Sequence, residues 1–198
     1  MDLGLYKFLN GLANSADGFE DPVRFVTLNA PVFFVALLAG LFFARGKWRS
    51  RNGRHAVVAA GFSALLALGV AHLITDLWAR PRPYVAHPTI AHLFVPTSSD
   101  PSFPSDHATA AFAIAVAILL RHRKAGLVAV AMAILVSLSR VVVGTHYPSD
   151  VLGGAAVGTL AALVFWHPSV RGPLHRLADW ASGLYEDLVA ALLRRAPT

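Results

Sequence analysis

Long apolar runs separated by short polar links form the main pattern along the chain. Two runs, Phe25 to Ala44 and Ala56 to Ala79, can each cross a hydrocarbon layer of about 30 Å at a rise of about 1.5 Å per helical residue. A third run, Ala125 to Val143, has a similar length and keeps its polar residues near its C-terminal end. We therefore predict a membrane-spanning helix in each of these runs.

Two shorter apolar runs, Ala108 to Leu120 and Val151 to Trp166, would each also fit a buried helix of a soluble protein by length alone. Both follow a Pro-Ser-Asp sequence, at residues 104–106 and 148–150, which is typical of a helix start. Each helix is therefore expected to begin in a polar region above the lipid and then to descend into it. With the longer runs they make about five spans.

Both ends of the chain carry apolar residues at helical spacing. They are Leu5, Phe8, Leu9 and Leu12 at the N-terminal end, and Leu177, Trp180, Leu184, Leu188 and Leu192 at the C-terminal end. These amphipathic helices could lie on the membrane or pack against the bundle. The predicted fold is an all-α, polytopic transmembrane bundle in which residues 1–198 form one membrane-embedded domain.

Composition supports a membrane protein. Of the 198 residues, 56% are hydrophobic and 14% are charged, whereas a soluble domain carries about 25% charged residues. The chain has no cysteine, which excludes disulfides and thiolate chemistry. The formal net charge is +6, but the basic residues form short clusters between apolar runs, which favours a role in topology over nucleic-acid binding.

The basic clusters also predict an orientation. They occupy two links and the C-terminal tail, all on one side of the five-span arrangement, and consist of Arg45, Lys47, Arg49, Arg51 and Arg54, then Arg121, Arg123 and Lys124, then Arg171, Arg176, Arg194 and Arg195. Positive charge marks the cytoplasmic side of a membrane protein. The C-terminus is therefore expected in the cytoplasm, and the other links at the outer face of the membrane.

Three polar segments are predicted at this outer face, at residues 80–83, 104–107 and 139–150. A proline-rich stretch from about Arg80 to Pro104 joins the first two segments and excludes a regular helix there. Arg82 and Arg140 supply planar donors for phosphate oxygens, and a helix N-terminus at residues 105–107 favours an anion. The sequence thus predicts a phosphate-binding site.

Two histidines and one aspartate could add chemistry to that site. Asp150, in the first helical turn after His146, can reach back to the imidazole and fix one ring nitrogen as a donor, which leaves the other as a nucleophile. His107 could then act as general acid and later as general base. Each residue alone would more often be structural, but ionisable groups that gather at one membrane face are normally functional.

These motifs resemble the signature of the type 2 phosphatidic acid phosphatase superfamily, whose three parts read KxxxxxxRP, PSGH and SRxxxxxHxxxD. The third part is complete, with Ser139 and Arg140, His146 and Asp150 at the family spacing. The second part reads PSDH, with Asp106 at the glycine position.

In the first part Arg82 is kept, but the lysine position falls on Thr75. The PSDH form, together with residues 81–87 and 146–153, resembles the bacitracin-resistance branch of the bacterial undecaprenyl pyrophosphate phosphatases. The resemblance covers roughly residues 5–190. Arg80, two residues before Arg82, is our candidate to replace the missing lysine.

The resemblance implies a fold of the phosphatase and haloperoxidase kind and a role for each motif residue. His146 would attack phosphorus to give a phosphohistidine, His107 would protonate the leaving group, and Asp150 would orient His146. Phosphate oxygens would be held by Arg82, Ser105, Asp106 through its backbone, Ser139 and Arg140, with Arg80 added. The scheme requires neither a metal ion nor another cofactor.

The function expected from the resemblance is hydrolysis of undecaprenyl pyrophosphate to the monophosphate, in the recycling of a cell-wall carrier lipid. Phosphatidylglycerol phosphate, phosphatidic acid or another prenyl pyrophosphate stays open as the substrate, because the motifs contact phosphate and not the tail. A transporter of lipid phosphates without hydrolysis, and a vanadate-binding haloperoxidase, are the alternatives from other classes. The oligomeric state is not predicted.

Overall fold

The computed structural model describes residues 2–15, 18, 20–44 and 50–195, and every regular element in these ranges is a helix. In chain order the helices are α1 (Asp2–Ser15), α2 (Glu20–Phe43), α3 (Arg51–Leu77), α4 (Pro83–Ala86), α5 (Asp106–Leu119), α6 (Arg123–Val142), α7 (Pro148–Val164) and α8 (Pro168–Arg195). The described ranges contain no strand, so the predicted all-α fold is confirmed.

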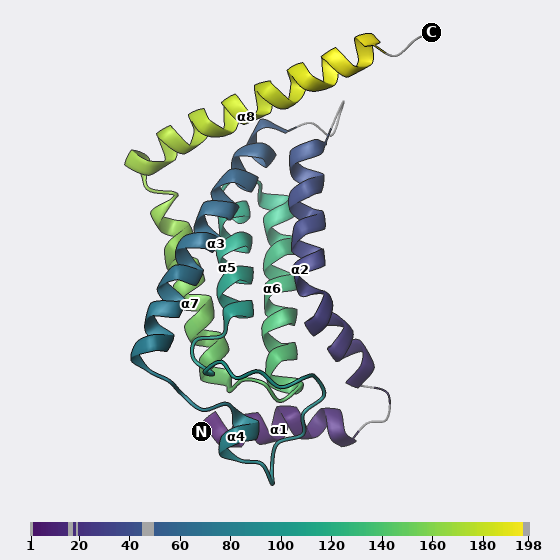
Figure 1. Cartoon of the computed structure of the whole chain (residues 1–198), viewed down its shortest axis with the longest axis vertical. Coiled ribbons are helices and arrows are strands. Elements are labelled where there is room, and N and C mark those ends of the chain that lie inside the picture. Colours follow the sequence, from purple (N-terminus) through teal and green to yellow (C-terminus); the bar gives the residue numbers. More distant parts are fainter. Residues whose placement is uncertain (1, 16–17, 19, 45–49, 196–198) are drawn as a thin grey trace.

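The bundle consists of α2, α3, α5, α6 and α7, which run side by side in alternating directions (Figure 1). α1 and α4 lie at one end of the bundle, and α8 crosses the other end. By length and composition α2, α3 and α6 can each cross a membrane, whereas α5 has 14 residues and α7 is bent by 79° from α8. The five predicted spans correspond to the five bundle helices. Two of these, α5 and α7, are shorter than a helix that crosses a membrane by itself.

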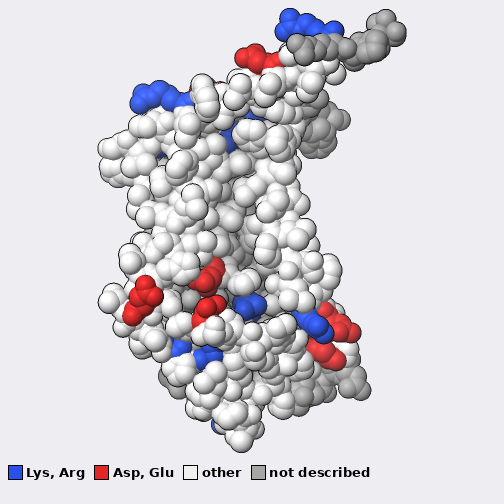
Figure 2. Space-filling model, in the orientation of Figure 1, with Lys and Arg blue, Asp and Glu red and all other residues white. Residues whose placement is uncertain are grey.

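Small side chains allow α5 to occupy the centre of the bundle. It packs against α3, α6 and α7 through buried alanines such as Ala111 and Ala115. Large apolar residues instead point outward from the surrounding helices, and Val35, Leu65 and Leu160 are 64%, 71% and 63% exposed. Figure 2 shows an uncharged band around the middle of this face. Because such a surface is unfavourable in water, the outside of the bundle is suited to lipid.

Two glycines bring α5 and α7 unusually close. A Cβ atom on Gly154 would lie 2.6 Å from the carbonyl oxygen of Ser105, and one on Gly158 would lie 2.3 Å from that of Thr109. Any larger residue would therefore push the helices apart. The close approach holds the N-terminal ends of α5 and α7 next to each other, where the polar motifs lie.

α1 is attached to the same end of the bundle by Asn10. Its Nδ2 donates hydrogen bonds to the carbonyl oxygens of His92 at 2.7 Å and Val142 at 2.8 Å, and its Oδ1 accepts one from the His92 N–H at 2.9 Å. Leu5 and Phe8 on the other face of α1 are 49% and 64% exposed. The predicted packing of this amphipathic helix against the bundle is therefore confirmed for one face, and the other face exposes apolar side chains.

The prediction that no helix forms between Arg80 and Pro104 is wrong at one point. Pro83–Ala86 makes the single helical turn α4, with Arg82 as its N-cap. Proline at the first position of a helix loses no hydrogen bond, because that N–H has no partner within the helix. The remainder of the stretch lacks regular helix, as predicted.

α8 packs on the bundle through Leu174 and Ala178, which are buried, whereas Trp180 and Leu188 are 66% and 57% exposed. Polar contacts attach it to the start of α3, where Arg51 forms two hydrogen bonds with Asp179 and Arg54 pairs with Glu186. Part of the first basic cluster, residues 45–49, lies outside the described residues. Arg51 and Arg54 lie at the α8 end, as the topology predicts.

Candidate active site

A cavity of about 450 Å³ opens where the three polar segments meet, at the end of the bundle that carries α1 and α4. Arg82 enters it from the link after α3, His107 from the start of α5, Arg140 from the end of α6 and His146 from the link between α6 and α7. The predicted convergence therefore occurs within one cavity. Asp76, Asp100 and Asp106 also line it, along with His72 and Thr75.

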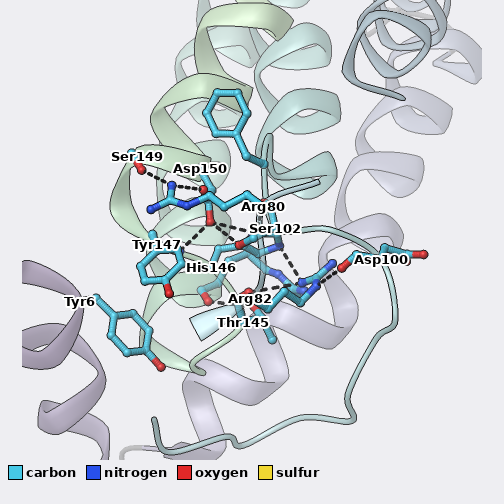
Figure 3. Close-up of polar contacts among 12 residues, drawn as sticks. Tyr6, Arg80, Arg82, Asp100, Ser102, Thr145, His146, Tyr147, Ser149 and Asp150 are labelled. Carbon is cyan, nitrogen blue, oxygen red and sulfur yellow. Dashed lines mark hydrogen bonds and ion pairs between the residues drawn. The ribbon is translucent and has the colours of Figure 1, made fainter. Parts of the chain in front are cut away.

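His146 is 2% exposed and has a different partner on each ring nitrogen (Figure 3). Nδ1 lies 2.8 Å from the carbonyl oxygen of Ser102, and Nε2 lies 3.2 Å from Nη1 of Arg82. A carbonyl can only accept a hydrogen bond, so Nδ1 carries the proton and Nε2 keeps its lone pair. The nitrogen on the cavity side is thus the one that can attack an electrophile.

Burial lowers the pKa of His146, and the nearby positive charges of Arg140 and Arg82 lower it further, against the opposing effect of Asp150. The net direction is below the ordinary value of 6.5. The imidazole is therefore neutral at pH 7, as a nucleophile must be.

Asp150 lies directly behind this histidine, in the first turn of α7, and its side chain is fully buried. Its carboxylate accepts hydrogen bonds from Arg80 at 2.6 Å, from the Tyr147 N–H at 2.8 Å and from the Ser102 hydroxyl. The distance from its Oδ2 to Nδ1 of His146 is 3.7 Å. The imidazole Nδ1–H donates to the Ser102 carbonyl, and the Ser102 hydroxyl donates to Asp150, so Ser102 connects the carboxylate to the ring.

The two cavity arginines are held differently. Arg82 donates from Nε to the carbonyl oxygen of Asp100 at 2.7 Å and from Nη1 to that of Thr145 at 3.3 Å, so its guanidinium is fixed in place. Nε of Arg140 is buried without a hydrogen-bond partner among the described residues. Together they give the inner cavity positive charge and free donors, a combination suited to phosphate oxygens.

α5 adds its N-terminus to the same cavity. Asp106 and His107 are its first residues, so backbone N–H groups that lack helical partners lie at this end. The Asp106 carboxylate is 50% exposed and lies 3.9 Å from Nε2 of His72. His107 also lines a second pocket of about 210 Å³ between α2, α5 and α6, where its neighbours include Phe34 and Ile114. His107 therefore separates a polar cavity from an apolar one.

Three residues predicted to hold phosphate do not line the cavity. Ser139 donates to the carbonyl oxygen of Val136 at 2.7 Å and accepts from Thr27 at 2.8 Å, because its position on α6 turns it toward α2. The Ser105 hydroxyl is buried behind the cavity, without a hydrogen-bond partner in the part of the chain that is described.

Arg80 is the third predicted phosphate-binding residue that does not line the cavity. Its guanidinium lies on the far side of Asp150 from the cavity, where it binds Asp2, Ser149 and Asp150. Thr75, at the family lysine position, lines the cavity and donates to the Phe103 carbonyl at 3.1 Å. Within the described ranges no lysine lines the cavity, and the nearby basic residue of the lining on α3 is His72.

Sequence reasoning missed Ser102 and Asp2, which both contact the group around Asp150. Ser102 lies two residues before Pro104, so its closeness to the second motif was a usable signal. Asp2 gave no local signal, because its contact depends on how α1 folds across the end of the bundle. Within the described ranges, no group of three or more His, Asp or Glu residues is arranged to hold a metal ion.

Comparison with known proteins identifies the family of this chain. The family model described as the PAP2 superfamily matches residues 56–171. The chain is 32% identical to the undecaprenyl-diphosphatase BcrC of Bacillus subtilis, over 98% of this chain and 97% of that one. It is 30% identical to the bacitracin transport permease protein BcrC of Bacillus licheniformis, over 94% and 88% of the two chains.

The fold is also similar to a solved structure. Aquifex aeolicus LpxE superposes with a TM-score of 0.66 at 21% identity, over 82% of this chain and 93% of that chain. A family match over more than half of the chain, with a relative that aligns along nearly all of it, means that the chain belongs to the PAP2 superfamily and is a membrane lipid phosphatase.

Proposed function

We propose that the chain hydrolyses undecaprenyl pyrophosphate to undecaprenyl phosphate and inorganic phosphate, which would recycle a carrier lipid of cell-wall synthesis. The near full-length similarity to an undecaprenyl-diphosphatase supports this. The observation that carries the proposal is the position of His107, which lines both the arginine-containing cavity and the apolar pocket. A pyrophosphate headgroup suits the first space and the start of an isoprenoid chain suits the second.

The reaction has two steps. Nε2 of His146 attacks the terminal phosphorus, a P–N bond forms, and the bond from that phosphorus to the bridging oxygen breaks. His107 donates a proton to the bridging oxygen, so the lipid leaves as its monophosphate. His107 then accepts a proton from water, whose oxygen attacks the phosphohistidine; the P–N bond breaks and inorganic phosphate is released.

Charge that develops on the transferred phosphoryl group would be stabilised by Arg82, Arg140 and the N-terminus of α5. The buried Nε–H of Arg140 supports this role, because it has no hydrogen-bond partner among the described residues and could donate to a phosphate oxygen. Asp106 would contribute its backbone N–H rather than its carboxylate. The scheme uses arginine charge where other phosphatases use a metal ion.

The orientation belongs to the same proposal. Arg51, Arg54 and the basic residues of α8 lie at the end of the bundle that α8 crosses, opposite the cavity (Figure 1). The positive-inside rule then puts α8 in the cytoplasm and the cavity at the outer face of the bacterial plasma membrane. Undecaprenyl pyrophosphate released by cell-wall polymerisation would meet the site on that side.

A substrate panel tests the proposal. Purified protein in detergent micelles would be assayed for phosphate release from undecaprenyl pyrophosphate, phosphatidylglycerol phosphate and phosphatidic acid, with a chelator present. We expect the fastest turnover with undecaprenyl pyrophosphate and no release by His146→Ala. Faster turnover of a glycerophospholipid would make that lipid, and not undecaprenyl pyrophosphate, the assigned substrate. Unchanged phosphate release by His146→Ala would show that His146 is not the nucleophile.

Transport without hydrolysis is the second candidate, because one relative is named a bacitracin transport permease protein. The same assay separates the two functions. A transporter needs no phosphohistidine and would release no phosphate from any lipid in micelles. Phosphate release that depends on His146 would exclude this candidate as the sole activity.

A further inference from the structure

Arg80 connects three parts of the chain that are far apart in sequence. Its Nη1 lies 2.6 Å from Oδ1 of Asp150 and 2.6 Å from the hydroxyl of Ser149, at the start of α7. Its Nη2 lies 2.7 Å from Oδ2 of Asp2, on α1. The guanidinium also stacks on the ring of Tyr147, with 4.1 Å between its carbon and the ring centroid. Figure 3 shows Arg80 on the side of Asp150 away from Arg82.

Asp2 contacts Ser149 as well as Arg80. Its Oδ1 accepts a hydrogen bond from the Ser149 N–H at 3.0 Å, and its Oδ2 accepts one from the Ser149 hydroxyl at 2.6 Å. Burial opposes ionisation of Asp2, but the hydrogen bonds from Ser149 and Arg80 outweigh it and hold the pKa of Asp2 below its ordinary value. Asp2 is thus a carboxylate that fixes both Arg80 and the first turn of α7.

The contacts of Asp2 and Arg80 matter because Asp150 is a fully buried carboxylate beside the proposed nucleophile, His146. A buried charge is stable only when it is paired and hydrogen-bonded. Arg80 supplies the opposing charge, and Ser102 and Tyr147 supply further donors. Asp2 then fixes Arg80 by a second ion pair, so the carboxylate of Asp150 is held on the side away from the cavity.

We propose that Asp2 and Arg80 are positioning residues, which hold Asp150, and through it Ser102 and the imidazole of His146, in the orientation needed for attack on phosphorus. This rests on the proposed phosphatase mechanism. α1 is then part of the catalytic apparatus and not only a membrane-surface helix. Arg80 acts on the histidine from outside the cavity and makes no contact with phosphate.

The role predicts a change in kcat rather than in substrate binding. We expect Arg80→Gln to lower kcat by about tenfold or more, the effect of removing one outer partner of an active-site group, with KM changed by less than about twofold. A phosphate contact would behave differently, because its loss would raise KM and weaken inhibition by inorganic phosphate. Arg82→Gln, which removes a cavity arginine, provides that comparison.

The pH profile gives a second readout that a purely structural role would not move. Loss of the Arg80 charge leaves the Asp150 carboxylate uncompensated beside His146, which favours the imidazolium form. The acid limb of kcat/KM should therefore move to higher pH in Arg80→Gln and return toward the wild-type position in Arg80→Lys. The other groups that face His146, Arg82, Arg140 and His107, are unchanged in these variants.

Asp2→Asn tests the connection to α1. We expect a smaller loss of kcat than in Arg80→Gln, and little additional loss in the double variant, because residues of one network are not additive. Lys7→Gln is the matched control, since Lys7 is an exposed charge on the same helix and its loss should leave kcat unchanged. Thermal unfolding of each variant identifies any loss of kcat that follows from loss of the folded protein.

Several outcomes would overturn the inference while leaving the phosphatase proposal intact. They are wild-type kinetics in Arg80→Gln, a rise in KM with unchanged kcat, or additive losses in the double variant, each in a preparation in which His146→Ala is inactive. If His146→Ala retains activity, the mechanism fails first. If Arg80→Gln does not fold, Arg80→Lys and Asp2→Asn still decide through kcat and the position of the acid limb.

Discussion

The imidazole of His146 lies between a backbone carbonyl and an arginine, and this pair of contacts decides its chemistry. The Ser102 carbonyl holds the Nδ1 proton, and Arg82 contacts Nε2 from the cavity side. Burial and the neighbouring arginines keep the ring neutral, since they disfavour a further positive charge. The arginines proposed to bind phosphate therefore also favour the neutral ring that the proposed attack on phosphorus needs.

A pH dependence follows at this scale. In the proposed mechanism the neutral imidazole attacks, and a lowered pKa means that the ring stays neutral until the pH falls through that lowered value. We expect the acid limb of kcat/KM to lie below pH 6.5, the ordinary value for histidine. Steady-state rates against pH would measure it, with the ionisation of the lipid pyrophosphate titrated separately in the same micelles. An acid limb at or above pH 6.5 that is not due to the substrate would contradict the assignment of this limb to His146.

Among elements, the contact between α5 and α7 contributes most to the geometry of the site. These helices carry His107 and Asp150 at neighbouring ends, and Gly154 and Gly158 allow their backbones to approach. In a membrane, where water does not drive helices together, close packing of small residues is a main source of association. The glycines therefore influence the candidate site from about one and two helical turns beyond Asp150.

We expect Gly158→Ala to destabilise the fold by about 1–3 kcal/mol, the usual cost of overpacking a close contact. The added Cβ would lie 2.3 Å from the carbonyl oxygen of Thr109, so α7 must shift away from α5. Thermal unfolding in detergent would measure the loss, and kcat should fall with it. Gly61→Ala on α3 is the control, because nothing lies within 4 Å of its added Cβ. Equal stability of the two variants would show that this contact is less tight than described.

Charge at the scale of the whole molecule is divided between the two ends. On the face in Figure 2 most acidic residues lie at the end with the cavity, together with several basic ones, and an uncharged band separates this end from the charged residues near α8. This division suits a membrane protein whose α8 end lies in the cytoplasm. The absence of cysteine makes the orientation simple to measure.

Single-cysteine variants would report the orientation directly. Ser99 lies in an exposed part of the cavity-side loop, and Ser169 is exposed at the start of α8. We expect a membrane-impermeant thiol reagent to label Ser99→Cys in intact cells, and to label Ser169→Cys only after the membrane is permeabilised. The reverse pattern would place the cavity in the cytoplasm and remove carrier-lipid recycling at the outer face from the proposal.

The sequence by itself determined the helices and the chemical groups that meet. Apolar run length identifies α2, α3 and α6, the Pro-Ser-Asp starts identify α5 and α7, and motif spacing identifies Arg82, His107, Arg140 and His146 as the cavity residues. These properties are local, because helix period, capping and charge patterning depend on residues close together in the chain.

Only the tertiary structure decided which way each polar side chain points. Ser139 turns toward α2, Arg80 lies behind Asp150, and Ser102 rather than Asp150 contacts the histidine ring directly. Such directions depend on helix rotation and on the course of the proline-rich loop. Both are set by packing between elements distant in sequence, as in the contact of Asp2 with Ser149.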